Sequence, residues 1–519
     1  MKSVSAEALR GWIQDHRELA ILDAREEAEF GAAHLFWAVN VALSRAELLL
    51  PALLPTPRTR VVCVDDGTGL AKRLAGLVER MGGTDVWVLE GGTKAWAARG
   101  ADAGYVLFSG VNVPSKAFGE WVEHHYGTES VEAPELAAWM RSGRKMIVLD
   151  SRPMEEFRAM SIPSGIDVPG GELVYRIGDL APDPETLVVV NCAGRTRSIL
   201  GAESLRRARI PNRVVALRNG TMGWELAGLE AARGASATYP AGRPATADIA
   251  LARAEAFAGE AGVRPIESAT LAGFAVDDTR TLHVLDVRAP DEFAAGHAPG
   301  TRNAPGGQLV QATDRWLAVR GARLVLVDDD GVRAAMTAAW LRLMGHREVY
   351  TIRMADLPPL PRLHTPVLPL VETVAPAQIG AGTPVLDLSR SIAFRAGHVA
   401  GSLWGVRTRL ARVREKLAGA PEVVVTSEDG RLAALAATEV AVLSGARVRV
   451  MAGGIAAWRE AGLPLAVDHA NPPDEACVDA YLRPYDRNSG VAAAMREYLS
   501  WEIDLVREIE RDGTVRFGV

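Results

Sequence analysis

The sequence is poor in cysteine, in aromatic residues and in long apolar runs. Its 519 residues include three cysteines, Cys63, Cys192 and Cys477, and aromatic residues make up 6% of the chain. Three thiols so far apart in sequence cannot form the disulfide framework of a small secreted protein, and no two of them lie at zinc-ligand spacing. Any cysteine chemistry must therefore use a single thiol, and we expect no metal and no other cofactor.

Neither sign of charge dominates the chain. It has 58 basic and 64 acidic residues, a formal net charge of −6, so its overall charge does not favour binding to nucleic acid. No window approaches the roughly 18 uninterrupted apolar residues of a membrane span. The N-terminus also lacks the apolar core of a signal peptide. We therefore predict a soluble, cytoplasmic protein that binds neither nucleic acid nor membranes.

One pattern occurs four times along the chain. The segments ILDAREEAEF, VLDSRPMEEF, VLDVRAPDEF and VLDLSRSIAF each place an apolar pair before an aspartate and a phenylalanine seven residues after it. The four aspartates are Asp23, Asp150, Asp286 and Asp387. Self-similarity of this kind indicates a repeat. Each copy has about 100 residues, which is enough for a core of its own.

Each copy continues with a second apolar run, a polar loop and a helix-like stretch. The runs RVVCVDDG, TLVVVNCAG, RLVLVDDDG and EVVVTSEDG are short, β-branched and continuous, as strands buried on both faces are. Three copies close with strand, turn and helix, and the third copy has a degenerate end. Strands that alternate with helices predict an α/β fold with four tandem domains, each a doubly wound parallel sheet flanked by helices.

The repeat also sets the expected domain boundaries. The predicted domains are residues 1–104, 128–235, 262–362 and 370–468. Residues 105–127 are more aromatic than a free linker, so we predict that they pack on a domain. Residues 469–519 form a tail whose apolar residues have helical spacing, which predicts an amphipathic helix that docks on a domain or on a second chain. A homo-oligomer formed through this tail is one expectation.

The residues around Cys192 carry the strongest sign of chemistry. The apolar run LVVVN leads directly into Cys192, and a helix-like stretch follows. A thiol, with an ordinary pKa of about 8.5, is a poor nucleophile until it is ionised. A helix N-terminus, loop N–H groups and an arginine each favour a thiolate, and Gly194 permits the loop to curl because it has no Cβ. The expected active loop is Cys192, Ala193, Gly194, Arg195, Thr196, Arg197 and Ser198.

Taken as a set, these motifs resemble the rhodanese-like family. The third copy has the family's opening motif between Asp286 and Gly300, the second has the loop headed by Cys192, and the first and fourth have the closing Gly-Gly…Ala-Trp segment. The resemblance implies a sulfurtransferase in which Cys192 attacks a donor such as thiosulfate, becomes a persulfide and passes sulfur to a thiol or cyanide. It also implies that Asp150 and Arg152 support the loop.

The same spacing identifies the matching positions in the other copies. The step from Asp150 to Cys192 is 42 residues, and an equal step in the first, third and fourth copies ends at Asp65, Asp328 and Asp429. A carboxylate cannot hold sulfur, and its charge repels an anionic donor. We therefore expect these three domains to be structural and without catalytic activity.

Two arginines of the loop are candidates for donor binding, and two other functions stay open. Arg195 and Arg197 are both expected to point at a dianionic donor, with Arg197 the better match to the family's loop.

One alternative is a non-enzymatic scaffold of rhodanese modules, in which Cys192 serves as a redox sensor or a sulfur relay to a partner. A Cys-dependent phosphatase is the other. It requires five residues between Cys and Arg, whereas four separate Cys192 from Arg197.

Overall fold

The computed structural model describes residues 2–380 and 382–518. The first sheet has the strand order β1-β5-β4-β2, with β3 beside β2, and these strands pair in parallel. Its elements are β1 (Lys2–Val4), α1 (Ala6–Gln14), β2 (Leu19–Asp23), α2 (Glu27–Ala32), β3 (Ala38–Asn40), α3 (Ala46–Leu53), β4 (Arg60–Val64), α4 (Leu70–Arg80), β5 (Asp85–Leu89) and α5 (Gly92–Ala97).

The second sheet has the parallel order β6-β10-β9-β7-β8, so the strand that precedes Cys192 lies at its centre. Its elements are β6 (Ser130–Val131), α7 (Ala133–Arg141), β7 (Met146–Asp150), α8 (Met154–Ala159), β8 (Ile166–Asp167), α9 (Leu173–Leu180), β9 (Leu187–Asn191), α10 (Thr196–Arg207), β10 (Val214–Leu217) and α11 (Gly220–Leu226). Every residue of β9 is buried, as its β-branched sequence predicts.

The third sheet repeats this order as β11-β16-β15-β12-β13. The elements of this part of the chain are α12 (Ala247–Glu260), β11 (Arg264–Pro265), α13 (Ser268–Val276), β12 (Leu282–Asp286), α14 (Pro290–Ala295), β13 (Arg302–Asn303), α15 (Gly306–Gln311), β14 (Val319–Arg320), β15 (Arg323–Asp328), α16 (Val332–Leu343) and β16 (Val349–Arg353). At the expected degenerate end, a short 3-10 turn at Met354–Asp356 follows β16. Strand β14 pairs antiparallel with β2 and thereby joins the third domain to the first sheet.

The fourth sheet has the parallel order β17-β21-β20-β18-β19. Its elements are β17 (Thr373–Val374), β18 (Val385–Asp387), α17 (Ser391–Ala396), β19 (Leu403–Trp404), α18 (Arg414–Leu417), β20 (Glu422–Thr426), α19 (Arg431–Ser444), β21 (Arg447–Met451) and α20 (Gly454–Glu460). The predicted α/β fold with four parallel sheets flanked by helices is therefore confirmed.

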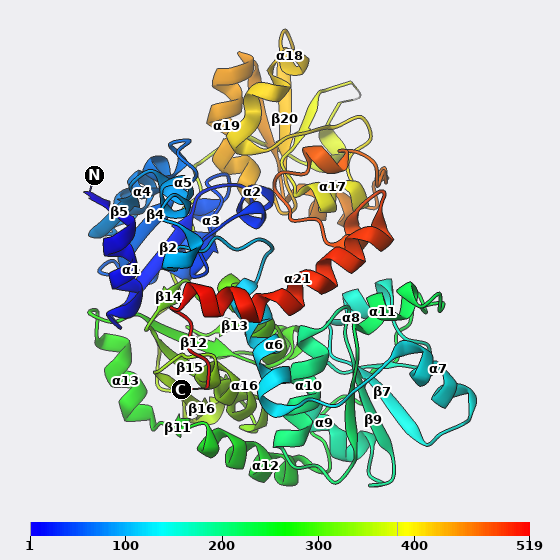
Figure 1. The fold of residues 1–519 in the computed structure, drawn as a ribbon. Coiled ribbons are helices and arrows are strands. Elements are labelled where there is room, and N and C mark those ends of the chain that lie inside the picture. The colour runs from blue at the N-terminus through cyan, green and yellow to red at the C-terminus, as the bar shows by residue number, and fades with distance from the viewer. Residues whose placement is uncertain (1, 381, 519) are drawn as a thin grey trace.

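Two helices outside the repeats join the domains. Helix α6 (Val113–Tyr126) packs against α10, and α21 (Val491–Asp512) packs against α6. Figure 1 shows α21, in red, running across the centre of the molecule between the first and fourth domains above and the second and third domains below. The tail thus forms the predicted amphipathic helix and docks within its own chain, with Leu499, Leu505 and Ile509 buried. A homo-oligomer formed through the tail stays a prediction.

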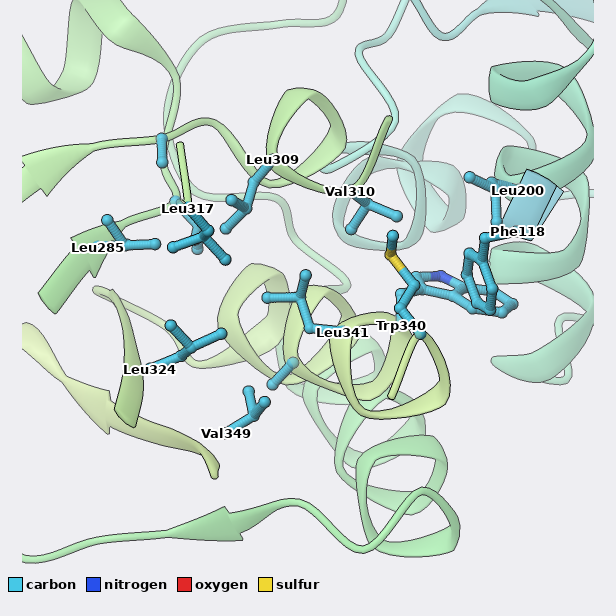
Figure 2. Close-up of a cluster of buried hydrophobic side chains, with 14 of the residues drawn as sticks. Phe118, Leu200, Leu285, Leu309, Val310, Leu317, Leu324, Trp340, Leu341 and Val349 are labelled. Atoms are coloured by element: carbon cyan, nitrogen blue, oxygen red, sulfur yellow. The ribbon is translucent and has the colours of Figure 1, made fainter. Parts of the chain in front are cut away.

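The first three domains share one continuous hydrophobic core. It extends through α6 and α10 into the third domain and includes Leu505 and Ile509 of α21. Figure 2 shows Phe118 of α6, Leu200 of α10 and Trp340 of α16 close together at this junction. The Trp340 indole also donates a hydrogen bond to Ser204 of α10 at 2.8 Å. The second and third domains therefore pack against each other, and helix α6 lies in the same core.

Within the described residues, no helix combines the length and the apolar character needed to cross a membrane.

Candidate functional site

Cys192 begins the loop between the buried strand β9 and helix α10, and its residue is 2% exposed. The closing segment of the repeat holds this loop in place. Thr221 donates its backbone N–H to the Cys192 carbonyl at 2.8 Å, and Met222 donates to the Ala193 carbonyl at 2.9 Å. Gly220, at the start of α11, has φ +54° and lies so close to the Cys192 carbonyl that a Cβ there would clash. The glycine of the closing motif is therefore needed to seat the loop.

The Cys192 thiol lies beside the first turn of α10. Its Sγ is 3.6 Å from the Ser198 hydroxyl oxygen, and that hydroxyl donates a hydrogen bond to the Arg195 carbonyl at 2.8 Å. The first N–H groups of a helix have no acceptor within the helix. In α10, the first N–H that bonds to a preceding carbonyl is that of Ile199, which donates to the Arg195 carbonyl. The earlier amides of α10 can therefore stabilise negative charge on the Cys192 sulfur or on a sulfur that it carries.

Strand register identifies the matching position in the other three domains. Each opening aspartate pairs with the residue before that position, namely Asn191, Val64, Val327 and Thr426 in the second, first, third and fourth domains. The residues equivalent to Cys192 are therefore Asp65, Asp328 and Ser427. The expectation of Asp429 is wrong because the fourth copy is two residues shorter between its two central strands, which an ungapped count cannot detect.

In those three domains the loop amides are occupied by the chain's own side chains. The Asp65 carboxylate accepts hydrogen bonds from the backbone N–H groups of Gly67 at 2.9 Å and Ala71 at 3.0 Å. The Asp328 carboxylate accepts three such bonds, from Gly331, Arg333 and Ala334. The Ser427 hydroxyl accepts from the N–H of Ala433 at 3.3 Å. These loops have no thiol, and their side-chain oxygens take the amides that would hold an external anion.

The Cys192 loop instead opens into a cavity of about 100 Å³. Loop residues 192–197 form one wall. The third domain contributes Gln308, Gln311 and Arg315, and the chain after the fourth domain contributes Tyr481, Arg483, Tyr485 and Tyr498. This volume corresponds to a few water molecules at roughly 30 Å³ each. The cavity therefore suits a small molecule.

Arg197 lines this cavity and is held by Glu156 of α8. Its two terminal nitrogens donate to the two Glu156 oxygens at 3.0 Å and 2.7 Å. Burial would raise the pKa of Glu156, but Arg197, followed by Arg483 and Arg152, outweighs burial and holds that pKa at about 2. Burial would likewise lower the pKa of Arg197, yet Glu156 and the Cys192 thiolate raise it above its ordinary value. Arg197 is therefore a fixed positive charge beside the sulfur.

The structure corrects the expectation for Arg195. Its Nε and one terminal nitrogen donate to the two carboxylate oxygens of Glu120 on α6, each at 2.8 Å, and it also pairs with Glu123. Glu120 is fully buried, and burial raises its pKa to about 7 even though Arg195 lies beside it. The guanidinium of Arg195 is thus committed to the linker helix, so Arg195 fixes the loop against α6.

Gly194 is needed for a different reason from the predicted curl. It is not among the glycines with positive φ, and a Cβ at this position would lie 3.2 Å from Glu502 Oε2 and 3.5 Å from a ring carbon of Tyr498. Thr196 Oγ1 donates to the other Glu502 oxygen at 3.2 Å. The absence of a side chain at Gly194 therefore lets α21 approach the active loop.

Asp150 and Arg152 lie behind the loop rather than in the cavity. Arg152 donates two hydrogen bonds to the Asp150 carboxylate, both at 2.8 Å, and Asn191 donates to the same carboxylate at 2.7 Å. The Asn191 amide also donates to the Thr221 hydroxyl at 3.2 Å, and that hydroxyl donates to the Cys192 carbonyl at 3.1 Å. A buried network thus connects the opening motif with the residue that carries the thiol.

The other two cysteines lie in different surroundings. Cys63 is fully buried within β4, and burial raises the pKa of its thiol. Cys477 is 2% exposed, with its sulfur 3.4 Å from the Pro473 carbonyl, and burial raises its pKa as well. Neither thiol lines the cavity of Cys192. Among the described residues, no group of three or more His, Cys, Asp or Glu side chains has an arrangement that could hold a metal ion.

The comparisons with known proteins agree with this geometry. The Rhodanese-like domain family matches residues 5–99, 132–227 and 275–354, more than half of the chain. The chain belongs to the rhodanese-like family. A crystal structure of a thiosulfate sulfurtransferase from Pseudomonas aeruginosa is 43% identical to it, with a TM-score of 0.91 and coverage of 100% of both chains.

Two curated relatives match over a single domain-sized region. An HTH-type transcriptional regulator of Mycobacterium tuberculosis is 34% identical over 96 residues, which are 18% of this chain and 41% of that protein. The YqhL protein of Bacillus subtilis is 36% identical over 75 residues, which are 14% of this chain and 57% of that protein. This chain thus spans about two fifths and just over half of the lengths of these relatives, so they support the shared domain alone.

Sequence reasoning about this rhodanese-like chain missed the residues that close the cavity. Gln311 and Arg315 belong to a domain that lacks a catalytic cysteine, and Arg483 and Tyr485 precede α21 outside the repeats. The segment YLRPYDR is rich in tyrosine and arginine, as recognition surfaces are. That composition was the available signal, but the repeat pattern does not reveal which domain the segment contacts.

Proposed function

We propose that this chain is a sulfurtransferase in which Cys192 carries sulfane sulfur between a small donor and a small thiol or cyanide acceptor. The observation that carries the proposal is a contrast between the four loops. In three of them, backbone N–H groups of the loop donate hydrogen bonds to Asp65, Asp328 or Ser427. In the fourth, Cys192 places a thiol next to the start of a helix, and the loop faces a cavity. The full-length similarity to a thiosulfate sulfurtransferase supports the same reaction class.

The proposed first half-reaction loads the cysteine. The Cys192 thiolate attacks the outer sulfur of thiosulfate, a sulfur–sulfur bond forms, and the bond between the two donor sulfurs breaks. The electron pair of the broken bond leaves with sulfite, so Cys192 becomes a persulfide. Arg197 and the first amides of α10 stabilise the negative charge before and after the transfer, as the donors of an oxyanion hole do.

The second half-reaction returns the enzyme to its starting state. The acceptor, cyanide or a thiolate, attacks the outer sulfur of the persulfide, and the bond to the Cys192 sulfur breaks. The electron pair returns to Cys192 as a thiolate, and the product is thiocyanate or a new persulfide. The chain needs neither a metal nor an oxidant for this cycle. A cytoplasmic location belongs to the same proposal, because three unpaired cysteines suit a reducing compartment.

Turnover with thiosulfate and cyanide tests the proposal against the two alternatives. We expect thiocyanate formation by the wild-type chain, its loss in Cys192→Ser, and wild-type rates in Cys63→Ser and Cys477→Ser. A scaffold of rhodanese modules would give no turnover in any variant. A phosphatase would release phosphate from an aryl phosphate in a manner dependent on Cys192, which the proposal does not predict.

A further inference from the structure

The chain after the fourth domain lies directly on the active loop of the second. Ala193 packs in a small hydrophobic cluster with Met495 and Leu499 of α21. Glu502, which is fully buried on the same helix, accepts a hydrogen bond from the Thr196 hydroxyl and forms an ion pair with Lys116 at 2.6 Å. Helix α21 and the segment before it therefore form part of the site. They cover the loop that carries Cys192 and form a wall of its cavity.

The arginines and the lysine that line the cavity differ in how far they are already paired. Arg195 is bound by Glu120, Lys116 is bound by Glu502, and Arg197 is bound through both terminal nitrogens by Glu156. A cation held by a carboxylate is less available to an incoming anion, because the anion must compete with that carboxylate for it. These three side chains are therefore weaker candidates for binding an anionic donor than a cation without a close carboxylate.

Arg483 and Arg315 are different. The nearest carboxylate oxygen of Glu156 lies 3.8 Å from Arg483 Nη1, beyond hydrogen-bond distance, and this nitrogen donates its hydrogen bond to the Tyr485 hydroxyl oxygen at 3.0 Å. The Arg483 side chain is 39% exposed. Arg315 has no acidic partner within 4.0 Å in the described part of the chain, and it lines the same cavity from the third domain. Their charges are available to a ligand.

On this basis, and given the sulfurtransferase activity proposed above, we infer that Arg483, assisted by Arg315, binds the oxyanion group of the sulfur donor and sets its class. That class is a small sulfane-sulfur donor with two negative charges, such as thiosulfate. The second domain supplies the reacting thiol and the fixed charge of Arg197, whereas specificity for a dianion comes from two residues outside that domain. A domain without a catalytic cysteine and a segment outside the repeats thereby complete the site.

A matched pair of donors tests this inference. Thiosulfate is a dianion, and methanethiosulfonate is a monoanion that has a methyl group in place of one oxygen. Both transfer the same outer sulfur, one releasing sulfite and the other methanesulfinate. Charge-assisted hydrogen bonds of this kind make roughly a ten- to hundredfold difference in kcat/KM. We expect Arg483→Gln to lower kcat/KM for thiosulfate by that factor, mainly by raising KM. For methanethiosulfonate we expect kcat/KM to fall only a few-fold.

Controls separate specificity from damage to the fold. Arg487→Gln removes an exposed arginine of the same segment that does not line the cavity, and it should leave both donors unaffected. Arg483→Lys keeps the charge and should recover part of the preference for thiosulfate. Arg315→Gln should show a smaller loss of the same kind. Equal losses with both donors in Arg483→Gln, or no loss with either, would overturn the inference. If the wild-type chain takes sulfur from neither donor, the proposed function itself has failed.

Discussion

The Ser198 hydroxyl oxygen lies 3.6 Å from the sulfur of Cys192, and the residue six positions after the loop's first residue is a serine in this domain alone. The equivalent residues are alanine in the other three domains, namely Ala71, Ala334 and Ala433. In each of those loops the alanine's backbone N–H donates to the side chain at the position of Cys192. The second domain keeps the backbone N–H at this position and adds a hydroxyl, which donates to the Arg195 carbonyl and accepts from the Cys192 thiol.

Removing this hydroxyl should slow the reaction of Cys192. Once Cys192 is a thiolate it no longer donates, and the Ser198 hydroxyl can turn from the Arg195 carbonyl to the sulfur. This exchanges a neutral hydrogen bond of about 1 kcal/mol for a charged one of roughly 1.5–3 kcal/mol, so we expect Ser198→Ala to lower kcat/KM by roughly a few-fold to thirtyfold. The rate of Cys192 alkylation by iodoacetamide at neutral pH should fall in parallel. Ser198→Thr keeps the hydroxyl and is the control. An unchanged alkylation rate in Ser198→Ala would show that the hydroxyl does not act on the sulfur.

Arg197 should affect every donor alike. It is a fixed charge beside the sulfur, held by Glu156, so its removal weakens the thiolate itself rather than the recognition of one donor. We expect Arg197→Ala to lower kcat/KM for thiosulfate and for methanethiosulfonate by similar factors of about ten or more. Steady-state kinetics with both donors measure this. A loss confined to thiosulfate would assign donor selection to Arg197 instead of Arg483.

Arg195 should matter for stability more than for chemistry. Arg195→Met leaves Glu120 buried without its partner, and breaking a buried pair from one side costs about 3 kcal/mol or more. The double variant Arg195→Met/Glu120→Gln removes the charge on both sides and should recover much of the lost Tm. Thermal unfolding of the two variants checks this. The idea is wrong if the single variant keeps the wild-type Tm or the double variant is the less stable of the two.

Buried histidines should make the protein less stable in mild acid. Burial, the largest cause in each case, lowers the pKa of His34 and of His283 to about 3. The unfolded chain binds protons at these sites near pH 6.5, whereas the folded chain does not, so stability falls as pH drops below about 6.5. Each histidine contributes about 1.4 kcal/mol per pH unit.

His283 offers the clearest test of this pH dependence, because its Nε2 has no hydrogen-bond partner in the described structure. We expect His283→Leu to lose less Tm than the wild type between pH 6.5 and about 4.5. A parallel loss in both proteins would mean that protonation of His283 does not contribute.

Much of the fold could be predicted from the repeat, because strands buried on both faces and glycines at tight approaches leave clear local patterns. The loop headed by Cys192 could be found for the same reason. The sequence could not show that Ser427, and not Asp429, is equivalent to Cys192, since a two-residue deletion cannot be detected by counting residues from the opening aspartate. The pairing of Arg195 with Glu120 and the arrival of Arg483 in the cavity depend on how distant segments pack. Local sequence carries no signal for such contacts.

The intact mass of the protein after incubation with thiosulfate tests the central claim most directly. The account predicts the gain of a single sulfur atom, which dithiothreitol removes and which peptide mapping places on Cys192. Cys192→Ser should gain none, and Cys63→Ser and Cys477→Ser should gain one, since those two thiols are buried outside the cavity. A wild-type chain that gains no sulfur, or a label that maps to Cys63 or Cys477, would contradict the account.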